Sequence, residues 1–457
     1  MTESRKDINK DIKQDKRIYT LSSERPAKAV VSMGLPLIAG MFIMVLYNLV
    51  DTFFIGLMRD DYQLAAVNLA YPVMMVTIAI SNMVGTGAST LIARSIGAGE
   101  MEKADRTLTT GFVLTVITSL VITVLGLLFL DPIVQGLGAK SNTMLYTQQY
   151  VRILLIGTLF TMGNYTFGQL LRGEGSVKPS ILGMAAGTIA NILLDPLFIF
   201  GLGLQIRGAA IATVLGNAVG MGITVAIYIK GRSILKPGRA YIRPNREIVT
   251  EIYRVGVPAA LETLLTSAAY IVNNNLAVAY GELTVAAMGI SQKLMSLGNY
   301  IYQGFAAGVQ PIMGYNYGAK NHQRMLAILK AGVLIVSCTE LAVMLIYGVF
   351  APFLIGIFTD SPEVIDTGSK VLRALICILP FVGATSMSRM SFQAMGRPMH
   401  AFVITLVRQL VLYIPLLFLM NHVWHFNGLI WAQPVTEVIM MAVSLRLLVK
   451  TIKELPD

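Results

Sequence analysis

The sequence predicts an all-α membrane protein with twelve transmembrane helices in two six-helix lobes related by pseudo-two-fold symmetry. Composition is the first observation that predicts this fold class. Apolar residues make up 55% of the 457 residues and charged residues only 13%, and the mean hydropathy is +0.66. A soluble domain averages about 25% charged residues. Because so few charges cannot cover the surface of a chain of this length in water, we expect a bilayer as its solvent.

The apolar runs are the second observation, since a helix needs about 20 mostly apolar residues to cross a membrane. Six such runs are expected in the first half, at 30–57, 65–92, 107–131, 146–171, 178–203 and 208–230. Six more are expected in the second half, at 250–280, 284–313, 326–355, 364–395, 399–421 and 427–448. Short connections between the runs predict antiparallel neighbours.

A long-range repeat is the third observation. Gly34-Leu-Pro36 opens the first helix and Gly256-Val-Pro258 opens the seventh, 222 residues later. Further matches at an offset of 221 include Ala65-Ala66 with Ala286-Ala287, Gly87 with Gly308, Gly97-Ala98 with Gly318-Ala319, Arg152 with Arg373, and Gly175 with Gly396. Each half has an even number of helices, so the halves should be parallel repeats with a cavity between them. Transporters are built in this way.

The basic residues predict the domain organisation and the orientation. Lys and Arg gather in the gaps after even-numbered helices, which indicates that these gaps and both termini face the cytoplasm. We therefore expect a cytosolic tail at 1–28, an N-terminal lobe at 29–230, a cytosolic linker at 231–248 and a C-terminal lobe at 249–457, in the inner or plasma membrane. No cleavable signal peptide is visible at the start.

Several functional classes are disfavoured. The net charge of +11 comes from short gaps between apolar runs and does not indicate nucleic-acid binding. Cys338 and Cys377 lie in apolar runs, and the four His residues have no metal-ligand spacing. No G-x-x-x-x-G-K-[ST] run is present, so ATP is not the expected energy source. No catalytic constellation is visible, so we expect neither an enzyme nor a cofactor other than a coupling ion.

Two carboxylates at membrane depth are the main candidates for function, because ionisable groups there are costly. Asp51 lies in the outer part of the first helix, and Asp195 lies in the fifth helix, where Asn191 shares its face four residues earlier. Pro196 removes a backbone donor beside Asp195, which frees an oxygen for a cation. Thr213 on the sixth helix reaches the same depth. Two carboxylates that meet in a desolvated site should bind a proton as one unit.

The segments Gly34-Leu-Pro36, Tyr47-Asn-Leu-Val-Asp-Thr52, Leu171-Arg-Gly-Glu-Gly175 and Asn191-Ile-Leu-Leu-Asp-Pro196 resemble the multidrug and toxic compound extrusion (MATE) transporters, in their DinF-like branch. The resemblance extends through both halves. It implies a monomeric antiporter, embedded in membrane lipid, that exports lipophilic or cationic drugs and so confers antibiotic resistance. It also implies that Asp51, Asn191, Asp195 and Thr213 bind the coupling ion, H⁺ or Na⁺, with H⁺ favoured and no other metal expected.

Five further polar residues are weaker candidates for the substrate cavity: Tyr47, Asn164, Gln169, Glu262 and Gln292. Hydrogen bonding between helices is an equally good interpretation of each. Two other functions stay open. One is a flippase for a lipid-linked precursor, which the acidic N-lobe site disfavours because a pyrophosphate needs basic residues. The other is an integral-membrane enzyme that acts on lipids.

Overall fold

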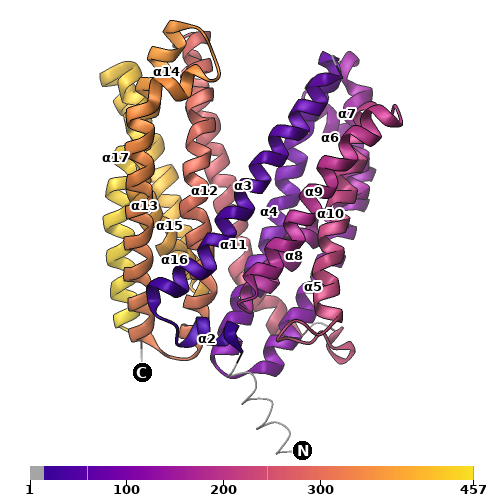
Figure 1. Cartoon of the computed structure of the whole chain (residues 1–457), viewed down its shortest axis with the longest axis vertical. Coiled ribbons are helices and arrows are strands. Elements are labelled where there is room, and N and C mark those ends of the chain that lie inside the picture. The colour runs from indigo at the N-terminus through magenta and orange to yellow at the C-terminus, as the bar shows by residue number, and fades with distance from the viewer. Residues whose placement is uncertain (1–14, 59, 244, 456–457) are drawn as a thin grey trace, which may run out of the picture. The chain divides into compact units, whose positions relative to one another are not determined.

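The computed structural model describes residues 15–58, 60–243 and 245–455, and these ranges are helical almost throughout (Figure 1). No strand is found in them. The prediction of an all-α fold is therefore confirmed.

The described chain forms two compact units, and two of the boundaries between them fall inside long helices. Unit 1 comprises Met1–Ile18 and Ala39–Ala260, and unit 2 comprises Tyr19–Ile38 and Leu261–Asp457. The boundaries interrupt α3 (Pro26–Leu57) and α11 (Arg246–Val278). The lobes expected from the sequence begin at the starts of these two helices, whereas the structural units begin further along them. These two boundaries follow the repeated Gly-x-Pro motif, two residues after Pro36 or Pro258, and a third boundary lies between Ile18 and Tyr19.

Unit 1 is a helical bundle in which the described elements after α3 follow the expected order. Two short elements flank the bundle, α2 (Lys16–Ser22) and the 3₁₀ turn η2 (Arg239–Tyr241). The others are α4 (Asp61–Gly97), α5 (Met101–Leu128), α6 (Leu130–Gly136), α7 (Ser141–Ile156), α8 (Thr158–Gly173), α9 (Val177–Pro196), the π-helical turn η1 (Leu197–Gly201) and α10 (Gln205–Ile229). Helix α9 packs along α10, and α8 packs against both α4 and α10.

One expected helix of unit 1 is broken. The run 146–171 forms α7 and α8, which are separated at Gly157. A Cβ atom at Gly157 would approach a methyl carbon of Val214 on α10 within 2.2 Å, closer than any real contact. The glycine at the break is thus required by the close approach of α10.

Unit 2 contains the remaining elements, and two of its expected helices are bent. They are α12 (Glu282–Gly318), α13 (His322–Gly356), α14 (Pro362–Ile376), α15 (Leu379–Ala394), α16 (Pro398–Leu406), the π-helical turn η3 (Val407–Tyr413) and α17 (Ile414–Lys453). The run 364–395 bends by 44° between α14 and α15. Within α17, His425 is non-helical (φ 50°, ψ −130°). This break separates the two expected helices 399–421 and 427–448.

The described helices are long and apolar enough for a membrane protein with many spans. Seven pass a test of length and hydropathy, or eight if α14 and α15 form one bent span. One of the seven, Pro398–Lys453, is 56 residues long and contains the break at His425. Large apolar side chains on outward faces are freely exposed, among them Leu128, Val349 and Phe353 at 67–71%. The count of twelve helices is consistent with these findings, and the orientation of the termini stays a prediction.

Candidate functional site

Asp51 on α3 and Asp195 on α9 lie against each other inside unit 1. Asp195 is fully buried, and Asp51 is partly buried. Their carboxyl groups are close enough to share a side-chain hydrogen bond. Such a bond requires a proton on one of them, because two carboxylates have no donor to offer. None of the ion pairs formed by the described residues involves either carboxyl.

Glycine packing brings the other two predicted ion-binding residues to the same place. Helices α9 and α10 approach closely through small residues, as membrane helices often do. A Cβ atom at Gly216 would meet the Cβ of Asn191 at 2.7 Å and the carbonyl oxygen of Gly187 at 2.8 Å. Thr213 lies one turn before Gly216, and Asp195 lies one turn after Asn191. Because the two helices are antiparallel neighbours, Thr213 comes to the level of Asp195.

Apart from the contact between the two carboxyl groups, the buried polar atoms of this cluster have no hydrogen-bond partners among the described residues. Both amide atoms of Asn191, both carboxyl oxygens of Asp195, the hydroxyl of Thr213 and Oδ1 of Asp51 are buried and unsatisfied. A buried polar group without a partner costs about 1–3 kcal/mol. So many such atoms in one place indicate a site that binds something small and polar.

The backbone beside the cluster is irregular. Helix α9 ends at Pro196 and continues as the π-helical turn η1, and π-helical turns frequently mark functional sites. The start of α10 packs on this turn, since a Cβ atom at Gly208 would meet the carbonyl of Phe198 at 2.6 Å. The presence of Pro196 in the sequence already predicted an irregular backbone beside the carboxylates.

Tyr150 on α7 is a member of the site that sequence reasoning missed. Its side chain is only 2% exposed, and it lies within electrostatic range of both Asp51 and Asp195. The sequence offers no clear signal for it, since Tyr150 follows Gln148 and Gln149 in a partly polar stretch of α7. Its proximity to the carboxylates depends on how α7 is rotated against α9.

A chain of amide side chains continues from the site. Asn217 donates to the carbonyl oxygen of Thr213 at 2.9 Å, and Asn164 on α8 donates to Oδ1 of Asn217 at 3.0 Å. Asn164, a predicted substrate contact, is thus connected through Asn217 to the carbonyl oxygen of Thr213 in the cluster. Its hydrogen bond ties α8 to α10.

The placement of the other predicted substrate residues in one cavity stays a prediction. Gln169 donates to Asn82 at 2.7 Å and joins α8 to α4. Glu262 belongs to unit 2, where it is 3% exposed and paired with Arg389 at 2.7 Å. Gln292 is half-buried on α12 of unit 2. The side chain of Tyr47 lies outside the described residues.

The chemistry of the cluster suits a monovalent cation. It offers two carboxyl groups, an amide oxygen and a hydroxyl, all hard oxygen ligands, together with groups that can hold a proton. In the described part of the chain, no group of three or more His, Cys, Asp or Glu could hold a metal ion. The residues present fit H⁺ or Na⁺.

Comparison with known proteins then identifies the family. The family model MatE matches the chain twice, over residues 36–197 and 258–419. The chain belongs to the MatE family. The two matches are equally long and 222 residues apart, which confirms the repeat seen in the sequence. The first match contains Asp51, Asn191 and Asp195, whereas Thr213 lies just beyond its end. The DinF-like branch stays a prediction.

Named relatives agree with this assignment over nearly the whole chain. The multidrug export protein MepA of Staphylococcus aureus (strain MSSA476) is 27% identical over 424 residues, 93% of this chain and 94% of MepA. The protein of the same name from Staphylococcus saprophyticus is 26% identical over 426 residues, again 93% of this chain and 94% of that relative.

Solved structures of MATE transporters have the same fold. A crystal structure of MATE in complex with MaL6 superposes with a TM-score of 0.92 at 29% identity, over 97% of this chain and 100% of that one. A multidrug resistance MATE family transporter in its outward-facing conformation gives 0.90 at 29% identity, over 96% and 99%. The fold of the MatE chain described here is therefore that of a transporter family, consistent with a multi-pass membrane protein.

Proposed function

We propose that this protein is a secondary multidrug exporter in which inward movement of H⁺ through the Asp51–Asp195 site drives export of lipophilic or cationic compounds. The observation that carries the proposal is the cluster of buried, unsatisfied polar atoms around two touching carboxyl groups. The multidrug export relatives support the substrate class, and the lack of a phosphate-binding loop in the sequence supports ion coupling.

A proton is favoured over sodium for electrostatic reasons. Two ionised carboxylates in contact repel each other, and no cationic side chain is paired with either. A single proton shared between them removes the repulsion and forms the hydrogen bond that their geometry allows. Sodium needs several oxygen ligands at once, which Asn191 and Thr213 can supply together with the carboxylates. The sodium alternative therefore rests on the same four residues.

Each residue has a role in the proposed cycle. Asp195 and Asp51 bind the ion, while Asn191 and Thr213 hold the ionised carboxylate by hydrogen bonds after the ion leaves. Tyr150 can donate to the same carboxylate. Ion binding from outside changes the contact between α3 and α9, weakens drug binding and releases the drug. No covalent step is involved, and we expect a monomer of the DinF-like branch in the inner or plasma membrane.

The test is dye efflux from energised vesicles, with pH and sodium gradients imposed separately. We expect a pH gradient alone to drive efflux of an ethidium-type dye. Efflux driven only by a sodium gradient would assign the same site to Na⁺. Absence of efflux under both gradients, with confirmed membrane expression and unchanged drug tolerance of the host, would refute drug export and favour the flippase.

Substitutions connect the activity to the site. The double variant Asp51→Asn and Asp195→Asn should lose gradient-driven efflux, because an amide keeps the shape but cannot exchange a proton. Asp131→Asn is the matched control, since Asp131 is an exposed acid of unit 1 that accepts a hydrogen bond from Gln148 at 2.7 Å. Wild-type efflux by the double variant would place the coupling site elsewhere.

A further inference from the structure

Near the end of α17, the last helix of unit 2, the side chains on one exposed face change from apolar to charged. Val438 and Val443 of α17 are 45% and 48% exposed, as lipid-facing residues are. Arg446 and Lys450 follow Val443 by three and seven residues, which places them on its side of the helix, and both are exposed. The face thus passes from apolar to cationic between Val443 and Arg446. On a membrane helix, such a change marks the boundary between hydrocarbon and headgroups.

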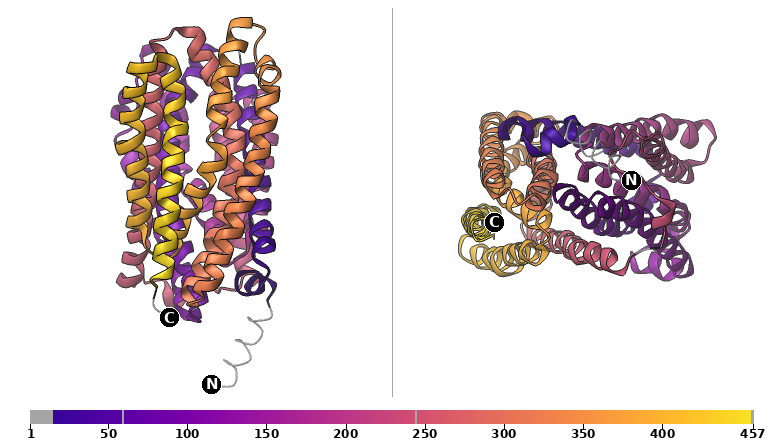
Figure 2. Two further views of the ribbon diagram at one scale, coloured as in Figure 1. Left: turned by 90° about the vertical axis from the view of Figure 1, so that its left-hand side faces the viewer. Right: turned by 90° about the horizontal axis from the view of Figure 1, so that it is seen from below.

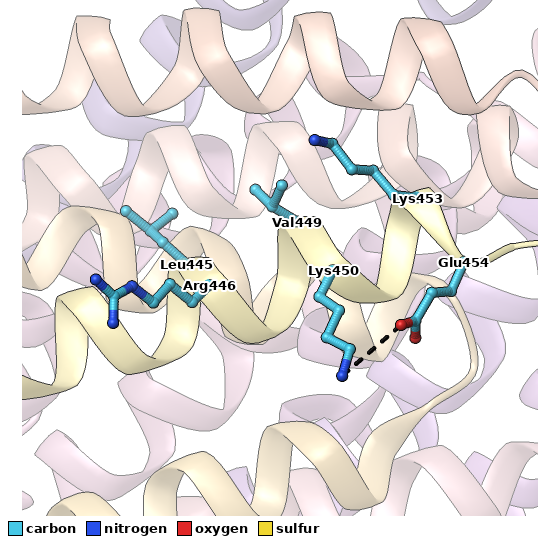
Figure 3. A pocket seen from close by; sticks show the side chains of 6 residues that line it. All are labelled: Leu445, Arg446, Val449, Lys450, Lys453 and Glu454. Atoms are coloured by element: carbon cyan, nitrogen blue, oxygen red, sulfur yellow. Dashed lines mark ion pairs between the residues drawn. The ribbon is translucent and has the colours of Figure 1, made fainter.

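The cationic segment borders a shallow hollow (Figure 3). Six residues line it: Leu445, Arg446, Val449, Lys450, Lys453 and Glu454. Its volume is about 570 Å³. The close-up shows two adjacent rows of side chains along α17, with Leu445, Val449 and Lys453 in one row and Arg446, Lys450 and Glu454 in the other. Leu445 lies beside Arg446 and Val449 lies beside Lys450, so the hollow offers both apolar and cationic contacts to a phospholipid.

The three cations are free to meet an anion. Lys450 pairs with Glu454 at 3.8 Å, but both side chains are more than 60% exposed, so this pair contributes little. Among the described residues, Arg446 and Lys453 form no ion pair. From Arg446 to Lys453 the helix rises about 10 Å, which suits a headgroup layer. Arginine binds phosphate with two parallel hydrogen bonds, and lysine adds a mobile point charge.

We propose that Arg446, Lys450 and Lys453 bind the phosphate of an anionic phospholipid in the leaflet next to the end of α17. Leu445 and Val449 contact the start of its acyl chains. The site is separate from the carboxylate cluster, which lies in unit 1, and it does not depend on the transported substrate. A second view of the molecule shows the last part of α17, in yellow, leading to the C-terminus (Figure 2).

The test counts lipids retained by the purified full chain in native mass spectrometry, with phosphatidylglycerol or phosphatidylcholine added. The wild-type protein should retain phosphatidylglycerol in preference to phosphatidylcholine. The triple variant Arg446→Gln, Lys450→Gln and Lys453→Gln should lose that preference by on the order of 100-fold, since each cation near an anionic surface contributes about 1 kcal/mol. Arg446→Lys keeps the charge and should retain most of the binding.

The matched control removes three charges elsewhere. Lys230→Gln, Arg243→Gln and Arg246→Gln change exposed cations of unit 1 and should leave the preference intact. An equal loss in this control would mean nonspecific attraction and would overturn the site. Unchanged retention by the α17 triple variant would also overturn it. Displacement of the lipid by millimolar inorganic phosphate would identify free phosphate as the occupant and would equally refute the proposal.

Discussion

Two sets of buried acids, one in each unit, have opposite surroundings. In unit 1, Asp51 and Asp195 face each other without a cation. In unit 2, Glu262 pairs with Arg389 and Glu437 pairs with Arg408, each at 2.7 Å. The repeat makes the difference sharper, because the position of Asp51 corresponds to the neutral Asn273.

This difference separates acids that we expect to stabilise the fold from acids that we propose to bind an ion. A buried carboxylate whose cation is adjacent has its charge compensated permanently. A pair of carboxylates without a cation has an electrostatic cost that only a bound proton or metal ion removes. The electrostatic cost of two facing carboxyl groups is present in unit 1, whereas the position in unit 2 that corresponds to Asp51 is the neutral Asn273. The paired carboxyl groups therefore do not serve a structural need common to both units.

The largest expected effect is in unit 1. Asp195→Asn should abolish dye efflux driven by a pH gradient, because the remaining carboxyl has no partner with which to share a proton. Initial efflux rates in vesicles measure this, and a thermal unfolding scan checks that the variant is folded.

Glu340→Gln in unit 2 is the matched variant. Glu340 is also fully buried, with both carboxyl oxygens unsatisfied among the described residues, but it has no second acid beside it. We expect this variant to retain coupled efflux. A loss as complete as that of Asp195→Asn would show that ion coupling is not confined to unit 1.

The second prediction concerns stability. Glu437→Gln leaves Arg408 buried and without its carboxylate, and breaking a buried ion pair costs about 3–5 kcal/mol. The unfolding midpoint should therefore fall, while efflux per folded molecule persists. A variant with wild-type stability but without efflux would reverse the assignment and make Glu437 part of the coupling site.

The third prediction tests the packing that assembles the unit 1 site. Gly216→Ala places a methyl group against Asn191 and Gly187, and overpacking costs about 1–3 kcal/mol. Gly222→Ala on the same helix meets nothing within 4 Å and is the control. We expect only the first to lower thermal stability and slow efflux. Equal behaviour of the two would show that the contact between α9 and α10 does not position the site.

The smallest effect concerns Glu174, which lies in the loop after α8 and is fully buried. Burial raises the pKa of Glu174 above 4.5, although Ser176, Ser233 and the Leu235 amide donate hydrogen bonds to it. An acid with a raised pKa favours folding below its unfolded value, so stability should decline as pH rises from about 4.5 towards the folded value. Glu174→Gln should remove this decline, and the exposed control Glu100→Gln should not. Unfolding midpoints over that pH range measure it.

Much of the fold was predictable because the bilayer imposes a simple rule on sequence. Runs of about 20 apolar residues are required for spanning, and each expected run corresponds to a helix or a pair of helices. The breaks were not predictable, and the contact between Gly157 and Val214 of α10 is visible only in the tertiary structure. The exchange of the first parts of α3 and α11 between the units was also invisible in the sequence.

The sequence by itself identified Asp51, Asn191, Asp195 and Thr213 as candidate functional residues, because polar groups at membrane depth are costly whatever their orientation. Only the tertiary structure showed that the two aspartates lie next to each other, that Tyr150 lies near both, and that Glu262 forms an ion pair with Arg389. Partners on distant helices depend on helix rotation and on glycine contacts between neighbours. Helix rotation and glycine contacts are set by the packing of helices against one another, so the sequence of a single helix does not reveal them.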